Sequence, residues 1–163
     1  IEVSELEEYF HKNIFETGIL NLLTKYGFSC INLKKIEGKE IDCGEIDVIA
    51  YSGERNEFIV VEAKNLSLSR DAKAMTQVIN DHFKQKRYHR KFLRKIEWFH
   101  DNVNHVSQLL NEKFNVKVRE EAKINSFFIT RNESVIKYMI SDYVVISFEE
   151  FDKLLSNGYE NGN

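Results

Sequence analysis

The feature that most constrains the fold is an uninterrupted apolar run that ends in charged residues. Residues 58–64 read Phe-Ile-Val-Val-Glu-Ala-Lys, with no alternation between apolar and polar positions before Glu62. A strand of this kind is buried on both faces, which is typical of a sheet covered by helices on both sides. The run therefore predicts an α/β domain. It also places Glu62 and Lys64 on the same face of the sheet as Val60, because side chains alternate along a strand.

The segments around this run predict the remaining elements of the domain. A first helix opens at Ser4, where Ser4 and Glu7 form a capping box, and ends before Gly27. A last helix is capped by Ser147 and Glu150. Short apolar runs predict four further strands, at residues 28–36, 45–51, 124–130 and 143–147. A polar segment between the last two predicts a short helix at 133–140.

A long amphipathic stretch from about residue 69 to 114 predicts helical structure that must break. One helix of this length would span roughly 68 Å, whereas a domain of this size has a radius of gyration of about 15 Å. The sequence favours Asp101 and Asn102 as the main break. The apolar periodicity also fades at residues 84–90, which predicts a second irregularity there.

Composition excludes several classes of protein. The net charge of −3 over 163 residues excludes a globally basic nucleic-acid binder, although it allows a local basic patch. Two cysteines, Cys30 and Cys43, are too few for a disulfide scaffold or a structural zinc site, so we expect reduced thiols in a cytoplasmic protein. No apolar run approaches the roughly 20 residues that cross a bilayer, so we expect no membrane span. No serine-hydrolase elbow, Walker loop or dinucleotide fingerprint is present.

Three acids occupy faces that should be apolar, namely Glu16, Asp47 and Glu62. Asp47 shares its side of a strand with Ile49, and Glu62 shares its side with Val60, while Glu16 falls on the apolar stripe of the first helix. Burying an unpaired carboxylate costs several kcal/mol, so such groups normally pair or hold a metal. Carboxylate oxygens suit Mg²⁺, so these positions predict a divalent cation site.

Two alternatives remain open on spacing alone. Glu62 and Lys64 would pair with each other at the end of a strand, and Asp47 would cap a turn. Separately, Glu45, two residues before Asp47 on the same face, is either the real ligand or merely exposed, and it ranks below Asp47 because it follows Gly44 at the ragged start of its strand.

The residues from Gly44 to Ala50, Gly-Glu-Ile-Asp-Val-Ile-Ala, followed by Val-Val-Glu-Ala-Lys at 60–64, resemble the core motif of the PD-(D/E)xK nuclease superfamily. The resemblance is to its restriction-endonuclease-like and Holliday-junction-resolvase-like branches, and it covers roughly residues 5–130. The 14 residues between Asp47 and Glu62 suit the hairpin that joins the two motif strands. Glu16 lies on the first helix, upstream of Gly27, as in the resolvase-like members. Ile46 stands where many members have proline.

The resemblance implies a restriction-endonuclease-like core, in which a mixed central sheet is flanked by helices in the order αβββαβ. Here a C-terminal αβα extension would follow. We expect residues 1–156 to form a single nuclease-like domain and residues 157–163 to form a flexible tail. Because the chain begins with Ile1 rather than methionine, we expect it to be a module with an additional domain N-terminal to residue 1.

The activity that the resemblance implies is Mg²⁺-dependent hydrolysis of DNA phosphodiesters by metal-activated water, in restriction, defence or repair. Mn²⁺ is the expected substitute for Mg²⁺, and members of the family often act as homodimers. Two alternatives are a catalytically silent nuclease-like domain that binds nucleic acid or a protein partner, and a nuclease directed at RNA.

The same resemblance assigns roles to individual residues. Asp47, Glu62 and the backbone carbonyl of Ala63 would bind Mg²⁺, and Lys64 would position or activate the attacking water. Glu16 would be an outer ligand or a ligand of a second metal. A glutamine on the next helix would orient a ligand or a phosphate, and this residue is Gln77, with Gln85 as the alternative.

A basic stretch lies inside the long helical segment. It runs from residue 84 to 95 without an acid, and its cations are Lys84, Lys86, Arg87, Arg90, Lys91, Arg94 and Lys95. Such a concentration of positive charge predicts contacts with several phosphates of a nucleic acid. Tyr88 or His89 would stack on an unpaired base. The alternative is a solvated helix face, which is the usual place for a run of charges.

Overall fold

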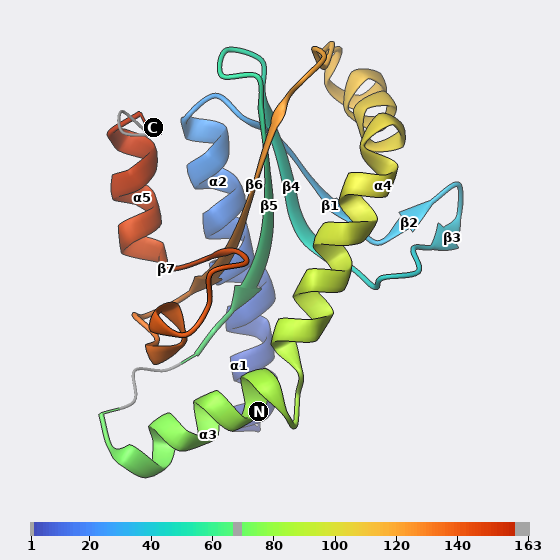
Figure 1. Cartoon of the computed structure of the whole chain (residues 1–163). Coiled ribbons are helices and arrows are strands. Elements are labelled where there is room, and N and C mark those ends of the chain that lie inside the picture. The colour runs from blue at the N-terminus through green and yellow to red at the C-terminus, as the bar shows by residue number, and fades with distance from the viewer. Residues whose placement is uncertain (1, 67–69, 159–163) are drawn as a thin grey trace.

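The computed structural model describes residues 2–66 and 70–158 and shows a mixed five-stranded sheet between two layers of helices (Figure 1). The strand order is β1–β4–β5–β6–β7, with β1 Ser29–Leu33, β4 Ile46–Ser52, β5 Glu57–Lys64, β6 Lys123–Thr130 and β7 Val144–Ser147. β1, β4 and β5 pair antiparallel, whereas β5, β6 and β7 pair parallel. The predicted α/β class, with helices flanking a mixed sheet, is therefore confirmed.

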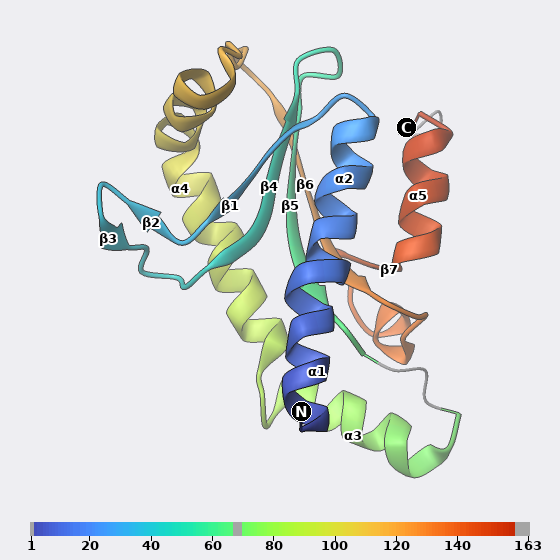
Figure 2. The same ribbon diagram turned by 180° about the vertical axis from the view of Figure 1, so that it is seen from behind.

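One face of the sheet is covered by helices from the two ends of the described chain (Figures 1 and 2). The N-terminal helix consists of α1 Val3–Phe10, a π-helical turn at His11–Glu16 and α2 Thr17–Lys25, and α5 Phe148–Ser156 packs beside α2. Ile19 and Leu23 of α2 and Phe151 of α5 are buried against this face. The other face is covered by α4 Tyr88–Phe114, whose Phe99 ring meets Phe58 with centroids 5.1 Å apart.

The long helical stretch divides in two, because α3 Ala72–Phe83 ends and the chain turns before α4 begins (Figure 1). Residues 84–87 form the turn, and Arg87 adopts the left-handed conformation with φ 55°. The irregularity predicted at 84–90 is thus the real end of a helix. Asn102 is only a kink inside α4, with φ −119°, and its side chain donates to the carbonyl of Trp98.

The helix termini follow the sequence in part. Gly27 has φ +88° directly after the first helix, and Ser147 Oγ accepts the N–H of Glu150 at the start of α5, as predicted. The capping box at Ser4 is wrong, because the helix begins at Val3 with Glu2 at its N-cap and no side-chain cap. Smaller elements complete the chain, namely the hairpin strands β2 Lys35–Ile36 and β3 Lys39–Glu40 and a 3₁₀ turn at Val135–Tyr138.

The described residues also bear on two expectations from composition. Cys30 and Cys43 are both free thiols. None of the helices within residues 2–66 and 70–158 has the length and apolar character to cross a bilayer. Of the expected tail, residues 159–163 lie outside the described part of the chain.

Candidate active site

The register of two neighbouring strands brings the predicted acids of the sheet together. β4 and β5 pair antiparallel with Val48 opposite Val61, so the next positions along the two strands are Asp47 and Glu62. Ile49 and Val60 of the same strands point into the core beneath α4. By the alternation of strand side chains, Asp47 and Glu62 project to that same face, at the end of the sheet where β5 terminates.

Asp47 lies in an environment that disfavours its charge. Its Oδ2 accepts the backbone N–H of Ala63 at 2.8 Å, so it bonds the neighbouring strand rather than capping a turn. Burial and the negative charges of Glu62 and Glu16 raise the pKa of Asp47 to about 7, against the smaller opposing effect of the Ala63 hydrogen bond. Glu45, the alternative ligand, is exposed and accepts a hydrogen bond from Asn32 Nδ2 at 2.9 Å.

Glu62 is buried, with 5% of its surface exposed, and it is held by two lysines. Oε1 lies 3.2 Å from Lys64 Nζ, which is the pairing that spacing left open. Oε2 lies 2.7 Å from Lys95 Nζ, which comes from α4. Lys95 was predicted only as one cation of the basic stretch. Its position three residues after Phe92 and four before Phe99, on the buried stripe of α4, was a signal that could have identified it.

Lys64 is the last residue of β5 and is half-buried. Its Nζ lies 4.9 Å from the centre of the Tyr88 ring, a cation–π contact. Burial alone would lower the pKa of Lys64, but the carboxylates of Glu62 and Asp47 outweigh this effect and raise it. Lys64 is therefore an ammonium group at neutral pH. We refer to Asp47, Glu62, Lys64 and Lys95 as the carboxylate cluster.

Glu16 approaches this cluster from the opposite layer of helices. It is the last residue of the π-helical turn, which contacts β5, and its Oε1 lies 3.1 Å from His11 Nε2. Its charge contributes to the raised pKa of Asp47. Single π-helical turns within α-helices occur often at functional sites, where they re-aim a side chain.

A divalent cation fits the donor set of the carboxylate cluster. Among residues 2–66 and 70–158, no three His, Cys, Asp or Glu side chains are grouped closely enough to hold a metal together. Mg²⁺ needs fewer protein ligands than that, since it usually keeps several waters and binds one or two carboxylates plus substrate phosphates. Asp47 and Glu62 supply two carboxylates whose mutual repulsion such a cation would relieve.

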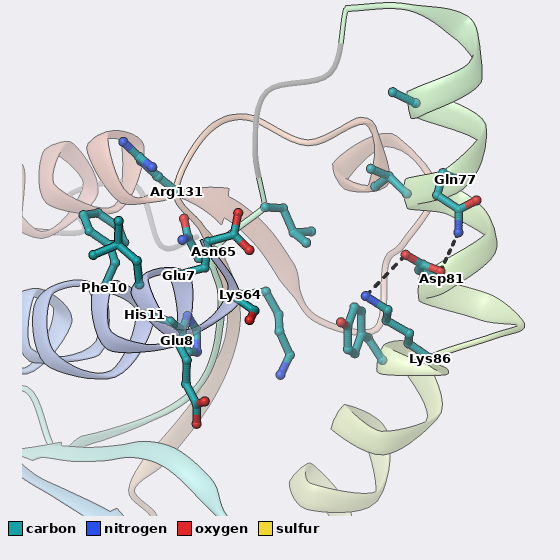
Figure 3. Close-up of a pocket in the computed structure, with 16 residues that line it drawn as sticks. Glu7, Glu8, Phe10, His11, Lys64, Asn65, Gln77, Asp81, Lys86 and Arg131 are labelled. Carbon is teal, nitrogen blue, oxygen red and sulfur yellow. Dashed lines mark hydrogen bonds and ion pairs between the residues drawn. The ribbon is translucent and has the colours of Figure 1, made fainter. Parts of the chain in front are cut away.

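An open cleft of about 1010 Å³ lies beside Lys64 (Figure 3). Phe10 and His11 line one side of it, and Gln77 of α3 lines the opposite side. Gln77 is exposed, and its amide donates to Asp81 Oδ1 at 2.8 Å. Gln85, the alternative to Gln77, follows α3 in the turn and is not among the described residues that line this cleft.

The basic stretch presents an exposed surface around the start of α4. Its exposed cations, which we call the basic surface, are Lys84, Lys86, Arg87, Arg90, Lys91 and Arg94. The expected stacking residues do not belong to it. The half-buried Tyr88 ring contacts Lys64, and His89 Nδ1 lies 2.9 Å from the hydroxyl of Tyr143.

A second polar cluster, which the sequence did not reveal, lies beneath the same helix. The Tyr143 hydroxyl lies 2.9 Å from His82 Nε2 of α3 and 2.9 Å from His89 Nδ1 of α4. Burial, and then the neighbouring His89, lower the pKa of the fully buried His82 to about 4. Burial raises the pKa of Tyr143, so both groups are neutral at pH 7. We call these three residues the tyrosine cluster.

The sequence was also compared with protein families and with curated proteins. No protein-family model matches the chain, and no curated protein sequence gives a significant match.

Proposed function

We propose that this protein is a Mg²⁺-dependent nuclease that hydrolyses phosphodiester bonds in DNA. The observation that carries the proposal is the position of Asp47 opposite Glu62 on neighbouring strands, with Lys64 bonded to Glu62 at the edge of an open cleft. The connectivity supports it as well. A helix precedes three antiparallel strands, and helices then lead to a parallel fourth strand, which agrees with a restriction-endonuclease-like core.

Each residue of the site would have a distinct task. Asp47, Glu62 and the carbonyl of Ala63 would hold the cation, which supplies an activated water and neutralises charge on the scissile phosphate. Lys64 would orient the attacking water and stabilise negative charge through its ammonium group. Glu16 would add negative charge at the rim of the site.

Two further groups would bind the substrate outside this centre. Gln77 lies across the cleft from Lys64, where its amide would orient a phosphate (Figure 3). The basic surface would neutralise phosphates of the flanking DNA, because its six cations are exposed and lie around the start of the helix that also carries Lys95.

Cleavage of supercoiled plasmid and linear DNA, with and without Mg²⁺, tests this proposal. We expect the wild type to cut only with Mg²⁺ or Mn²⁺, and Asp47→Ala and Lys64→Ala to lose roughly 100-fold or more of the activity, because each removes a group that acts on the transition state. Glu45→Ala is the matched control and retains activity, since Glu45 is an exposed acid of the same segment. Wild-type activity in Asp47→Ala would remove the assignment. Preferential cutting of RNA would change the substrate class.

A second candidate is a nuclease-like domain that binds nucleic acid without cutting it. The specific observation in its favour is that both oxygens of Glu62 contact lysines, which balances this carboxylate without a metal. This candidate predicts DNA binding that weakens steeply with salt, because the basic surface would release counterions, and no cleavage with either Mg²⁺ or Mn²⁺.

A further inference from the structure

Lys95 differs from every other cation of the basic stretch. Its side chain is 12% exposed, whereas the residues of the basic surface are all exposed. The stripe of α4 that carries it also carries the fully buried Phe92 and Phe99. A lysine is almost never buried in such a position unless it is paired, and here the pair is the 2.7 Å contact with Glu62 Oε2.

The contact places a positive charge on one oxygen of the carboxylate that would bind the metal ion. Lys64 lies against the other oxygen, Oε1, at 3.2 Å and belongs to the same strand as Glu62. A divalent cation that binds Glu62 must therefore share this carboxylate with ammonium groups or displace one of them. Repulsion between like charges a few ångströms apart is strong in a partly buried site, because little water screens it.

The two lysines are not equivalent in how they reach Glu62. Lys64 is fixed beside it at the end of β5, with a side chain that is 26% exposed and lies against Tyr88. Lys95 reaches Glu62 from α4, which covers one face of the sheet, through its four-carbon side chain. The residue before it, Arg94, is exposed. Because Lys95 belongs to α4 and not to the sheet, its contact with Glu62 is not fixed by the pairing of the strands.

We propose that Lys95 is a built-in counter-ion for Glu62, which holds this carboxylate in the metal-free protein and competes with the divalent cation for it. This inference rests on the proposed function, because it takes Glu62 as a metal ligand. It adds a residue that sets the affinity of the site for its metal. Lys95 is thus a positioning residue and not a catalytic residue.

Titration calorimetry with Mn²⁺ alone, in the absence of DNA, tests the proposal. We expect Lys95→Gln to bind Mn²⁺ about tenfold or more tightly than the wild type, because it removes the competing charge and keeps a hydrogen-bond donor for Glu62. Lys95→Met, which is also neutral, provides a second variant should the first not fold. Lys95→Arg keeps the charge and should bind like the wild type. Lys113→Gln removes an exposed charge from the far end of α4 and should change nothing.

Thermal unfolding of the same proteins gives an independent readout. Lys95→Gln should melt at a lower temperature than the wild type without metal, and saturating Mn²⁺ should raise its melting temperature by more, because ligand stabilisation grows with affinity. A lysine with only a packing role would lower the melting temperature without changing the Mn²⁺ response.

Asp47→Asn separates failure of this inference from failure of the proposed function. If Asp47→Asn abolishes Mn²⁺ binding but Lys95→Gln and Lys95→Met bind no more tightly than the wild type, the counter-ion role is wrong and the metal site stands. If neither the wild type nor any variant binds Mn²⁺, or if Asp47→Asn binds it like the wild type, the counter-ion role is wrong, and cleavage of DNA with and without Mg²⁺ then decides the proposed function by itself.

Discussion

The carboxylate cluster and the tyrosine cluster lie under the same helix and differ in how their polar groups are satisfied. In the carboxylate cluster, burial and neighbouring acids destabilise the charge of Asp47, and the cluster opens onto a cleft through Lys64. In the tyrosine cluster, hydrogen bonds to one hydroxyl tie α3 and α4 to the segment before β7. Buried acids that repel each other beside an open cleft are typical of a site that acts on a ligand, whereas buried hydrogen bonds between elements hold a structure together.

The largest effect on stability is expected at Glu62. Glu62→Gln should lower the free energy of unfolding by about 3 kcal/mol in metal-free protein, because Lys64 and Lys95 are left partly buried without their partner. Urea unfolding at pH 7 with a chelator measures this change, with the exposed Glu45→Gln as control. A loss no larger than that of the control would mean that the lysines are hydrated, and the contrast between the clusters would fail.

A smaller loss is expected in the tyrosine cluster. Tyr143→Phe should cost about 2 kcal/mol, because His82 and His89 both lose the hydroxyl that satisfies a ring nitrogen. Tyr138→Phe is the matched control, since its ring is 75% exposed and its loss of a hydroxyl should change little. The same urea titrations measure both variants. A Mn²⁺ affinity that changes in Tyr143→Phe would show that the two clusters are coupled and do not act separately.

A third effect depends on pH. A carboxyl group whose pKa is raised from 3.8 to about 7 binds its proton more tightly in the folded state, so its contribution to stability falls as the pH rises between these values. Asp47→Asn lacks this penalty and should be more stable than the wild type at pH 8, but not at pH 4.

The measurement is urea unfolding of both metal-free proteins from pH 4 to 8. His82 gives the opposite slope, since its pKa is lowered to about 4 and the folded state gains stability as the pH rises towards 6.5. The difference between wild type and Asp47→Asn isolates the contribution of Asp47. A difference that is the same at every pH would contradict the raised pKa.

Much of the fold follows from local patterns in the sequence. The buried strand β5, the strands on either side of it and the left-handed Gly27 were predicted because apolar runs and helix stops are local signals. The preference for a main break at 101 and 102 was wrong, because the helix ends before residues 84–87 and Asn102 is only a kink inside α4.

The residues of the candidate site also fall into those that local patterns predict and those that they do not. The acids could be found because a carboxylate on an apolar face is an anomaly within its own element. Lys95 also stands out on the apolar stripe of α4, but its pairing with Glu62 could not be found, because the two residues lie 33 positions apart and the contact depends on how α4 crosses the sheet. Tyr143 and His82 are 61 residues apart, and neither residue is unusual within its own element, so the sequence gives no local sign of their contact.

The π-helical turn at His11–Glu16 separates two tasks within one helix. α2 is packed into the core through Ile19 and Leu23, whereas α1 buries no side chain and contributes Phe10 to the cleft. Each residue of an α-helix turns the chain by about 100°. Shortening the turn by one residue would therefore swing the whole of α1 about its axis and leave the α2 contacts in place. The length of the π-helical turn therefore sets which side chains of α1 face the cleft. It can change while the packing of α2 in the core stays the same.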